Sequence, residues 1–144
     1  MADQTTQQMR IDAPLEVIWS VLTDFERYPE WARDLKEAAV LERDDEGRAI
    51  AVRFRAAAMG RSTSYVLRYE WDDAPARLPW ELIEGDIMRV LDGAYEFAER
   101  DGGTDITYHL RVDLAVPLPA FVKRRAEARI VGTALRELRD HVER

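Results

Sequence analysis

The hydrophobic period of the chain changes within residues 106–142, which read ITYHLRVDLAVPLPAFVKRRAEARIVGTALRELRDHV. Up to residue 114, apolar side chains stand at every second position, which is typical of a strand with one buried face. Beyond Pro117 and Pro119 they recur every three to four positions, which predicts a long helix with one apolar stripe. The alternating set is Ile106, Tyr108, Leu110, Val112 and Leu114, and the helical set is Val131, Ala134, Leu135, Leu138 and Val142.

Most of the chain before this point alternates in the same way. We expect strands over 5–12, 36–43, 49–58, 62–71, 80–84 and 87–99, because turn residues separate these segments. After Pro14, an apolar stripe through Val17, Ile18, Val21, Leu22 and Phe25 predicts a helix. Residues 24–31 are expected to form a turn, and 31–34 a second short helix.

Consecutive hairpins produce an antiparallel sheet, and a long amphipathic helix needs an apolar surface to cover. The fold class expected is therefore α+β. A curved antiparallel sheet of about six to seven strands would wrap around the long C-terminal helix, with one or two short helices after the first strand. No linker or repeat interrupts residues 1–144, so we expect a single domain.

The composition excludes several chemistries. The chain has 144 residues, no cysteine and two histidines. Thiolate catalysis and cysteine-ligated metals are therefore excluded, and neither His109 nor His141 has a second histidine at ligand spacing. We expect no metal and no cofactor. The formal net charge of −7 argues against DNA binding. An apolar run of membrane-spanning length and a leader segment are absent, so a cytoplasmic location is expected.

The charge is unevenly distributed along the chain. Residues 119–144 carry seven basic and four acidic groups, a net +3, which leaves −10 for the remainder. Lys123, Arg124 and Arg125 form a basic cluster near the start of the long helix. One interpretation is an anionic partner such as an acyl-carrier phosphopantetheine, a lipid headgroup or RNA. The other is that these cations pair with acidic loops of the protein itself.

Extending the helical stripe backwards from Val131 in steps of three and four reaches Ala128, Glu127, Arg124 and Phe121. This projection places Arg124 and Glu127 on the face that meets the sheet, at a spacing that allows contact. One interpretation is a polar pair that lines a cavity and orients a ligand carbonyl or hydroxyl, or acts as acid and base. The alternative is that the helix overhangs the sheet and both side chains are solvated.

Four aromatic side chains are further candidates for ligand contact. By strand parity, Tyr65 and Trp71 share one face, and Tyr95 and Tyr108 point inward from their own strands. A buried tyrosine hydroxyl requires a hydrogen-bond partner, so these residues either pack in the core or present polar tips to a ligand. No nucleophile motif accompanies them, and we assign no catalytic residue.

Several local motifs resemble those of a known family, the bacterial polyketide cyclase/dehydrase and coenzyme Q-binding proteins of the START-like (SRPBCC) helix-grip superfamily. The similarity extends over nearly the whole chain. It is carried by Ala13-Pro14, Val17-Ile18-Trp19, Val21-Leu22, Asp24, Tyr28-Pro29-Glu30-Trp31, Glu84-Gly85, Asp92-Gly93-Ala94-Tyr95, Gly103-Thr104 and Val116-Pro117-Leu118-Pro119.

The resemblance implies an elongated cavity between the sheet and the terminal helix, suited to an apolar or aromatic ligand. Three functions follow from it as hypotheses. The first is binding of a quinone, lipid or polyketide-like molecule. The second is a cyclase or dehydratase that uses Arg, Glu and Tyr side chains in the cavity. The third is an interaction protein of the ribosome-associating branch. We expect a monomer or a homodimer.

Overall fold

The computed structural model describes residues 3–58, 60–115 and 117–143. Seven strands form one sheet, namely β1 (Asp3–Ile11), β2 (Leu35–Arg43), β3 (Ala49–Ala58), β4 (Arg61–Tyr69), β5 (Arg77–Gly85), β6 (Met88–Arg100) and β7 (Gly103–Leu114). Their order in the sheet is β1-β7-β6-β5-β4-β3-β2, and every neighbouring pair is antiparallel. The expected α+β helix-grip architecture is confirmed.

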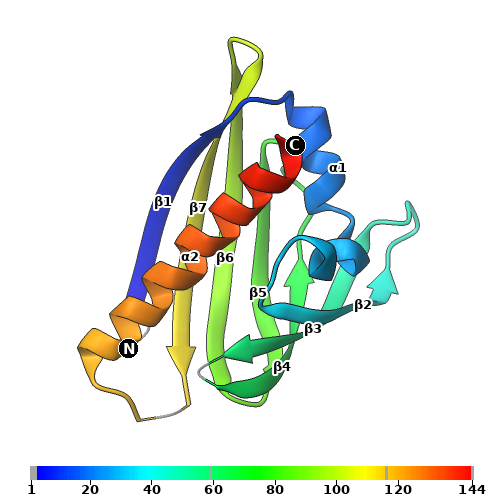
Figure 1. Ribbon diagram of the computed structural model, residues 1–144. Coiled ribbons are helices and arrows are strands. Elements are labelled where there is room, and N and C mark those ends of the chain that lie inside the picture. Colours follow the sequence, from blue (N-terminus) through cyan, green and yellow to red (C-terminus); the bar gives the residue numbers. More distant parts are fainter. Residues whose placement is uncertain (1–2, 59, 116, 144) are drawn as a thin grey trace.

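Three helical segments accompany the sheet. Helix α1 (Leu15–Leu22) and the 3-10 helix η1 (Phe25–Glu30) lie between β1 and β2, and α2 (Ala120–Val142) ends the chain. The sheet curves, and α2 runs along its concave side beside β1 and β7, as Figure 1 shows. The prediction of a turn over residues 24–31 was wrong. Residues 25–30 form a 3-10 helix, and Trp31 is the residue directly after it.

The boundary of β5 also differs from the prediction, which placed Pro79 in a loop. Pro79 has no N–H to donate, but its carbonyl accepts a hydrogen bond from the Glu70 N–H at 3.1 Å. Pro79 also pairs with Ala94 of β6. The strand therefore begins at Arg77, three residues before the predicted start at Trp80.

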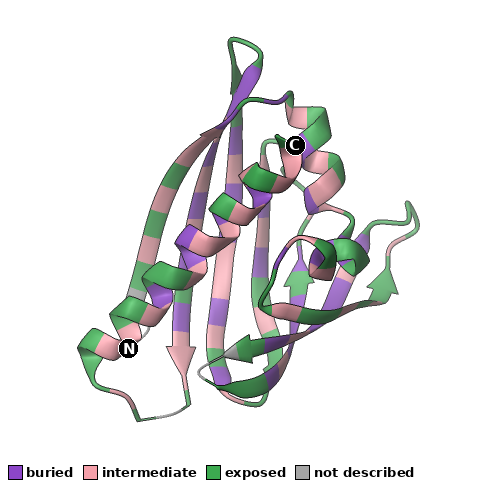
Figure 2. Cartoon of the chain, in the orientation of Figure 1, coloured by how far each residue is buried: buried purple, intermediate pink, exposed green. Residues whose placement is uncertain are grey.

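The core lies between the concave face and α2, where buried positions of the strands and helix face one another (Figure 2). From α2 the buried residues are Glu127, Val131, Gly132, Leu135 and Leu138. The expectation that Phe121, Arg124 and Ala128 face the sheet was wrong, because all three are exposed. The buried face of α2 continues from Leu135 toward the start of the helix in steps of four residues. It ends at Lys123, which is partly buried, and does not include Arg124.

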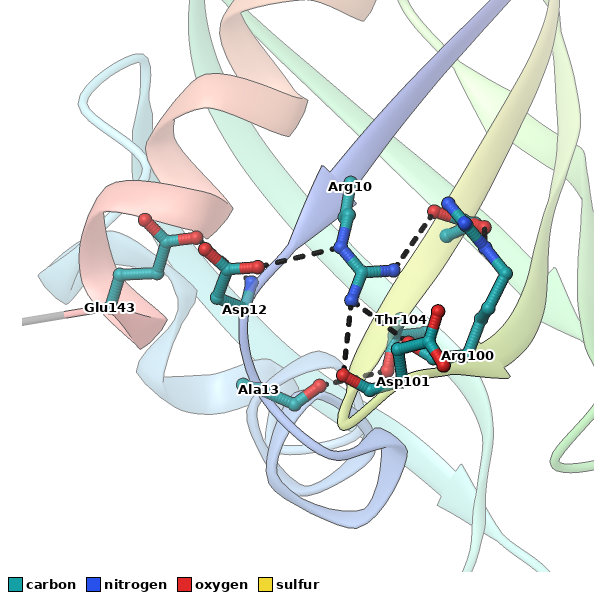
Figure 3. Close-up of polar contacts among 8 residues, drawn as sticks. Arg10, Asp12, Ala13, Arg100, Asp101, Thr104 and Glu143 are labelled. Atoms are coloured by element: carbon teal, nitrogen blue, oxygen red, sulfur yellow. Dashed lines mark hydrogen bonds and ion pairs between the residues drawn. The ribbon is translucent and has the colours of Figure 1, made fainter.

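A polar network ties the ends of β1, the β6–β7 turn and α2 together (Figure 3). The Arg10 guanidinium donates to the Arg100 carbonyl at 2.8 Å and lies 3.4 Å from the Asp12 carboxylate. The Asp12 N–H in turn donates to Oε2 of Glu143, at the end of α2, at 3.0 Å. The C-terminal end of α2 is thereby fixed against the first strand.

Candidate functional site

The concave face of the sheet encloses a cavity of about 180 Å³ beside α2. Its wall is formed mainly by aromatic and aliphatic side chains from β3 to β7 and by one face of α2. The aromatic members are Tyr28, Trp31, Phe54, Tyr69, Trp80, Tyr95 and Tyr108, and the aliphatic members include Leu35, Leu67, Met88, Leu91, Leu110, Ile130 and Ala134. We call this space the deep cavity.

Trp80 lies at the centre of the aromatic wall. Strand register places it opposite Tyr69 on β4, and its ring centroid lies 6.0 Å from that of Tyr69, 5.2 Å from that of Tyr95 and 5.7 Å from that of Tyr108. Tyr95 and Tyr108 are cross-strand partners whose rings meet edge to face at 4.8 Å. Successive side chains of a strand alternate between the two faces of the sheet, so these rings from four adjacent strands lie on one face and form this wall.

The indole N–H of Trp80 is a buried donor without a partner. Trp80 is 7% exposed, and its Nε1 has no hydrogen-bond partner among the described residues. Leaving such a group unpaired costs about 1–3 kcal/mol. Because Trp80 is one of the residues that line the deep cavity, this donor is a candidate partner for an acceptor atom of a ligand.

The tyrosines of the wall are neutral at physiological pH. Burial raises the pKa of Tyr69, Tyr95 and Tyr108 well above the usual value near 10, and neighbouring tyrosines add to the effect. Their side chains therefore contribute an apolar ring and an intact O–H, and no phenolate base, to the cavity wall.

A polar pocket of about 350 Å³ adjoins the deep cavity, and we call it the mouth. The two share Trp31, Asp34, Thr133 and Glu137 as lining residues. The backbone N–H of Arg33 donates to Glu137 Oε2 at 3.1 Å, and the Arg33 guanidinium is 4.0 Å from the same oxygen.

A second ion pair links the same two elements. Asp34 Oδ2 lies 4.0 Å from Nη2 of Arg129 on α2. Polar contacts thus join the 31–34 segment to α2 where the mouth meets the deep cavity.

A third space, of about 300 Å³, lies beside the first half of α2, and we call it the side pocket. It shares Asp34, Ala57, Met88 and Ile130 with the deep cavity. The rest of its wall is mainly apolar, with Ile87, Leu114 and Ala126. The mouth is therefore the most polar of the three spaces, and the deep cavity is the least polar.

The structure distributes the predicted ligand-binding residues unequally. Tyr95 and Tyr108 line the deep cavity. Tyr65 is buried and packs against Phe54 with ring centroids 5.6 Å apart, but it is absent from the cavity wall. Trp71 lines an outer groove beside α1, where its Nε1 donates to the Ala49 carbonyl at 2.8 Å.

The predicted residues of α2 lie away from the deep cavity. Val131 and Glu127 are buried, but neither belongs to the cavity wall. Phe121, Arg124 and Ala128 are exposed, as stated above. The cavity is lined instead by Ile130, Thr133, Ala134 and Glu137. These four residues have the i, i+3, i+4, i+7 spacing of one helix face, and that signal was present in the sequence.

The basic cluster at the start of α2 is partly neutralised by the protein itself. Lys123 Nζ lies 3.2 Å from Asp113 Oδ1 of β7. Its hydrogen bond to that carboxylate lowers the pKa of Asp113. This effect outweighs burial, which would raise that pKa. Arg124 and Arg125 are exposed.

Outside the cavity, His109 follows Tyr108 on β7 and therefore lies on the opposite face of the sheet. Its Nε2 is 2.5 Å from Glu96 Oε1, and its Nδ1 is 3.1 Å from Thr6 Oγ1. Among the described residues, no group of three or more His, Cys, Asp or Glu side chains is arranged to hold a metal ion. Within the same residues, no helix has the length and apolar character needed to span a membrane.

A curved antiparallel sheet that encloses an aromatic cavity against a long C-terminal helix defines the helix-grip fold. A family model described as "Polyketide cyclase / dehydrase and lipid transport" matches residues 11–139. The chain therefore belongs to this family, which confirms the resemblance inferred from the sequence motifs.

Solved structures share the fold. A START superfamily protein from Mycobacterium smegmatis is 21% identical, with 97% of each chain covered and a TM-score of 0.90. The Zhui aromatase/cyclase from Streptomyces sp. R1128 is 15% identical, with 100% of this chain and 95% of that chain covered and a TM-score of 0.86. A STAR-related lipid transfer protein from Xanthomonas axonopodis is 17% identical, with 98% and 86% covered and a TM-score of 0.76.

Proposed function

We propose that this protein binds a hydrophobic or aromatic small molecule in the deep cavity, with a carbonyl oxygen of the ligand accepting a hydrogen bond from Trp80 Nε1. The observation that carries the proposal is the buried indole N–H, unpartnered among the described residues, in a mainly apolar wall. Quinones and polyketide-like ketones combine an apolar ring with such an acceptor. The family membership, and the fold shared with a lipid transfer protein and an aromatase/cyclase, support the same ligand class.

The first experiment identifies what the protein carries. Native mass spectrometry of the purified protein, followed by extraction and identification of any bound compound, is expected to reveal an apolar carbonyl-containing molecule or an empty protein that accepts one. A strictly polar bound compound would contradict the proposal.

The second experiment tests the role of Trp80 with a matched ligand pair. 1-Tetralone and tetralin differ mainly by one carbonyl group, and equilibrium dialysis measures the affinity of each. Trp80→Phe is expected to weaken tetralone binding about fivefold, because one neutral hydrogen bond contributes about 1 kcal/mol. Tetralin binding is expected to change less than about twofold.

Trp71→Phe is the matched control, because it removes an indole that lies outside the deep cavity. It is expected to leave both affinities unchanged. Failure of the unmodified protein to bind either compound, or equal tetralone affinity with and without the Trp80 indole, would overturn the proposal.

Acid–base catalysis on a bound ketone is the second candidate function. It is favoured by one observation, the position of the largely buried Glu137 carboxylate at the junction of the deep cavity and the mouth. Glu137 would remove a proton from the carbon next to the carbonyl, and the enolate oxygen would accept from Trp80 Nε1. Glu137→Gln would then abolish turnover of a poly-β-ketone substrate while leaving tetralone affinity within about twofold.

The Arg124–Glu127 pair remains a weaker candidate for that chemistry, because Arg124 is exposed and Glu127 is absent from the cavity wall. The anionic partner of Lys123, Arg124 and Arg125 also remains a prediction. Arg124→Gln with Arg125→Gln tests it through loss of binding to an acyl carrier protein or to ribosomes in pull-down experiments.

A further inference from the structure

The deep cavity alone is small for its proposed task. Its volume of about 180 Å³ is below the 300 Å³ or more that is usual for pockets with drug-sized ligands. A ligand of that size must extend into a neighbouring space. The side pocket is mainly apolar, so a polar end of the ligand would lie in the mouth, where charged residues gather.

Three arginines and three carboxylates line the mouth, and all but one of these six groups form ion pairs. Arg33 is associated with Glu137 and Arg129 with Asp34, while Asp140 lies 3.9 Å from Arg139, the preceding residue of α2. Within the described chain, no ion pair joins Arg136 to a carboxylate, and its Nη2 instead donates to Thr133 Oγ1 at 3.4 Å. Arg136 is therefore the arginine of the mouth whose charge is not paired with a carboxylate among the described residues.

Thr133 connects this charge to the ligand space. It lines both the mouth and the deep cavity. Because a hydroxyl group that accepts one hydrogen bond still has its own proton to donate, the Arg136 contact leaves the Thr133 O–H free to donate. Arg136 and Thr133 together present a cation and a neutral donor, which suits a carboxylate or a sulfonate.

We infer that the natural ligand is an amphiphile, with an apolar body in the deep cavity and an anionic group at the mouth, recognised by Arg136 and Thr133. This inference rests on the proposed function, because it assigns the second end of the same ligand. The net charge of the protein is −7, so general electrostatic attraction does not favour an anion, and a preference for one requires a local site.

A pair of fluorescent probes tests the inference. 8-Anilinonaphthalene-1-sulfonate and N-phenyl-1-naphthylamine share an aromatic body, and only the first carries a negative charge. Arg136→Gln is expected to raise the Kd of the sulfonate probe about tenfold, because hydrogen bonds to charged groups are stronger than neutral ones. The Kd of the neutral probe is expected to change less than about twofold.

Two further variants complete the design. Thr133→Val keeps the size of the side chain and is expected to weaken the sulfonate probe selectively, by about threefold to fivefold. Arg68→Gln removes an equal charge from an exposed position of β4 that lines none of the three spaces, and it is expected to leave both probes unaffected.

The outcomes separate this inference from the proposed function. If the neutral probe does not bind, the apolar cavity proposal and this inference both fail. If the neutral probe binds but Arg136→Gln changes the two probes equally, or no more than Arg68→Gln does, only the anionic end is overturned. Selective loss of the sulfonate probe in both Arg136→Gln and Thr133→Val supports it.

Discussion

The indole of Trp80 occupies the space that a side chain at position 93 would need. A Cβ placed on Gly93 would lie 2.6 Å from Trp80 Cζ2, and it would also press on the backbone carbonyl of His109. Trp80 and Gly93 are cross-strand partners on β5 and β6. The absence of a side chain at 93 therefore allows the indole to lie at the centre of the cavity wall.

Gly93→Ala is accordingly expected to destabilise the protein and displace Trp80. Since neither the His109 carbonyl nor a packed indole moves freely, we expect a loss of about 1–3 kcal/mol in the free energy of unfolding, measured by urea denaturation. Tetralone affinity should fall as well. If the free energy of unfolding of Gly93→Ala lay within about 0.5 kcal/mol of that of the unmodified protein, the indole would have room to move.

All five tyrosines of the chain are expected to resist ionisation while the protein is folded. Burial raises the pKa of each above the ordinary value of 10.0, and the residues are Tyr28, Tyr65, Tyr69, Tyr95 and Tyr108. In the unfolded chain they release protons near pH 10, whereas the folded protein retains them. Stability contributed by the neutral hydroxyls is thus fully present below pH 10 and is lost as the pH rises above it.

Absorbance at 295 nm measures this directly. The folded protein should show little tyrosinate signal at pH 10 to 10.5, and the same sample in 6 M guanidinium should show most of it. A titration of two or more tyrosines near pH 10 in the folded protein would contradict the burial of these rings.

Glu137→Gln is expected to speed ligand entry. The substitution weakens the contact between Glu137 and Arg33, which joins the 31–34 segment to α2 at the junction of mouth and deep cavity. Because an ion pair with an exposed partner contributes about 0–1 kcal/mol, the association rate of N-phenyl-1-naphthylamine should rise by up to about fivefold in stopped-flow mixing. Glu16→Gln, at an exposed position of α1, is the control. A slower or unchanged association rate would mean that these contacts do not limit entry.

Two substitutions in α2 test which face of the helix is attached. Leu135→Ala removes a fully buried side chain and should cost about 2–5 kcal/mol of unfolding free energy. Arg124→Ala, at an exposed position, should change it by less than about 0.5 kcal/mol. Comparable losses for the two variants in urea denaturation would contradict the helix orientation.

The fold was predictable because each element carries its own periodic signal. Alternation along 106–114 and the helical stripe from Val131 to Val142 identified β7 and α2, and turn residues separated the other strands. Segment boundaries were less accurate where local rules conflict. Residues 72–79, which contain two prolines, were assigned to a loop, although Pro79 pairs with Ala94 of β6 and its carbonyl accepts from the Glu70 N–H directly after β4.

The site was only partly predictable, because a helix stripe can be extended backwards in more than one way. Steps of three and four from Val131 allow Arg124 or Lys123, and the contact of Lys123 with Asp113 belongs to the face that the structure has. Parity correctly placed Tyr95 and Tyr108 on the inward face. It could not rank Trp80 above Tyr65, since only the packing of neighbouring rings shows which of the two reaches the cavity.

Helix α2 carries two adjacent faces with separate tasks. Val131, Leu135 and Leu138 anchor it in the core, while Ile130, Thr133, Ala134 and Glu137 line the ligand space. Under the proposed function, substitutions on the second face are expected to alter ligand preference, while Val131, Leu135 and Leu138 keep the helix attached to the core. A library confined to these four positions would be a practical route to redirect the protein toward new ligands.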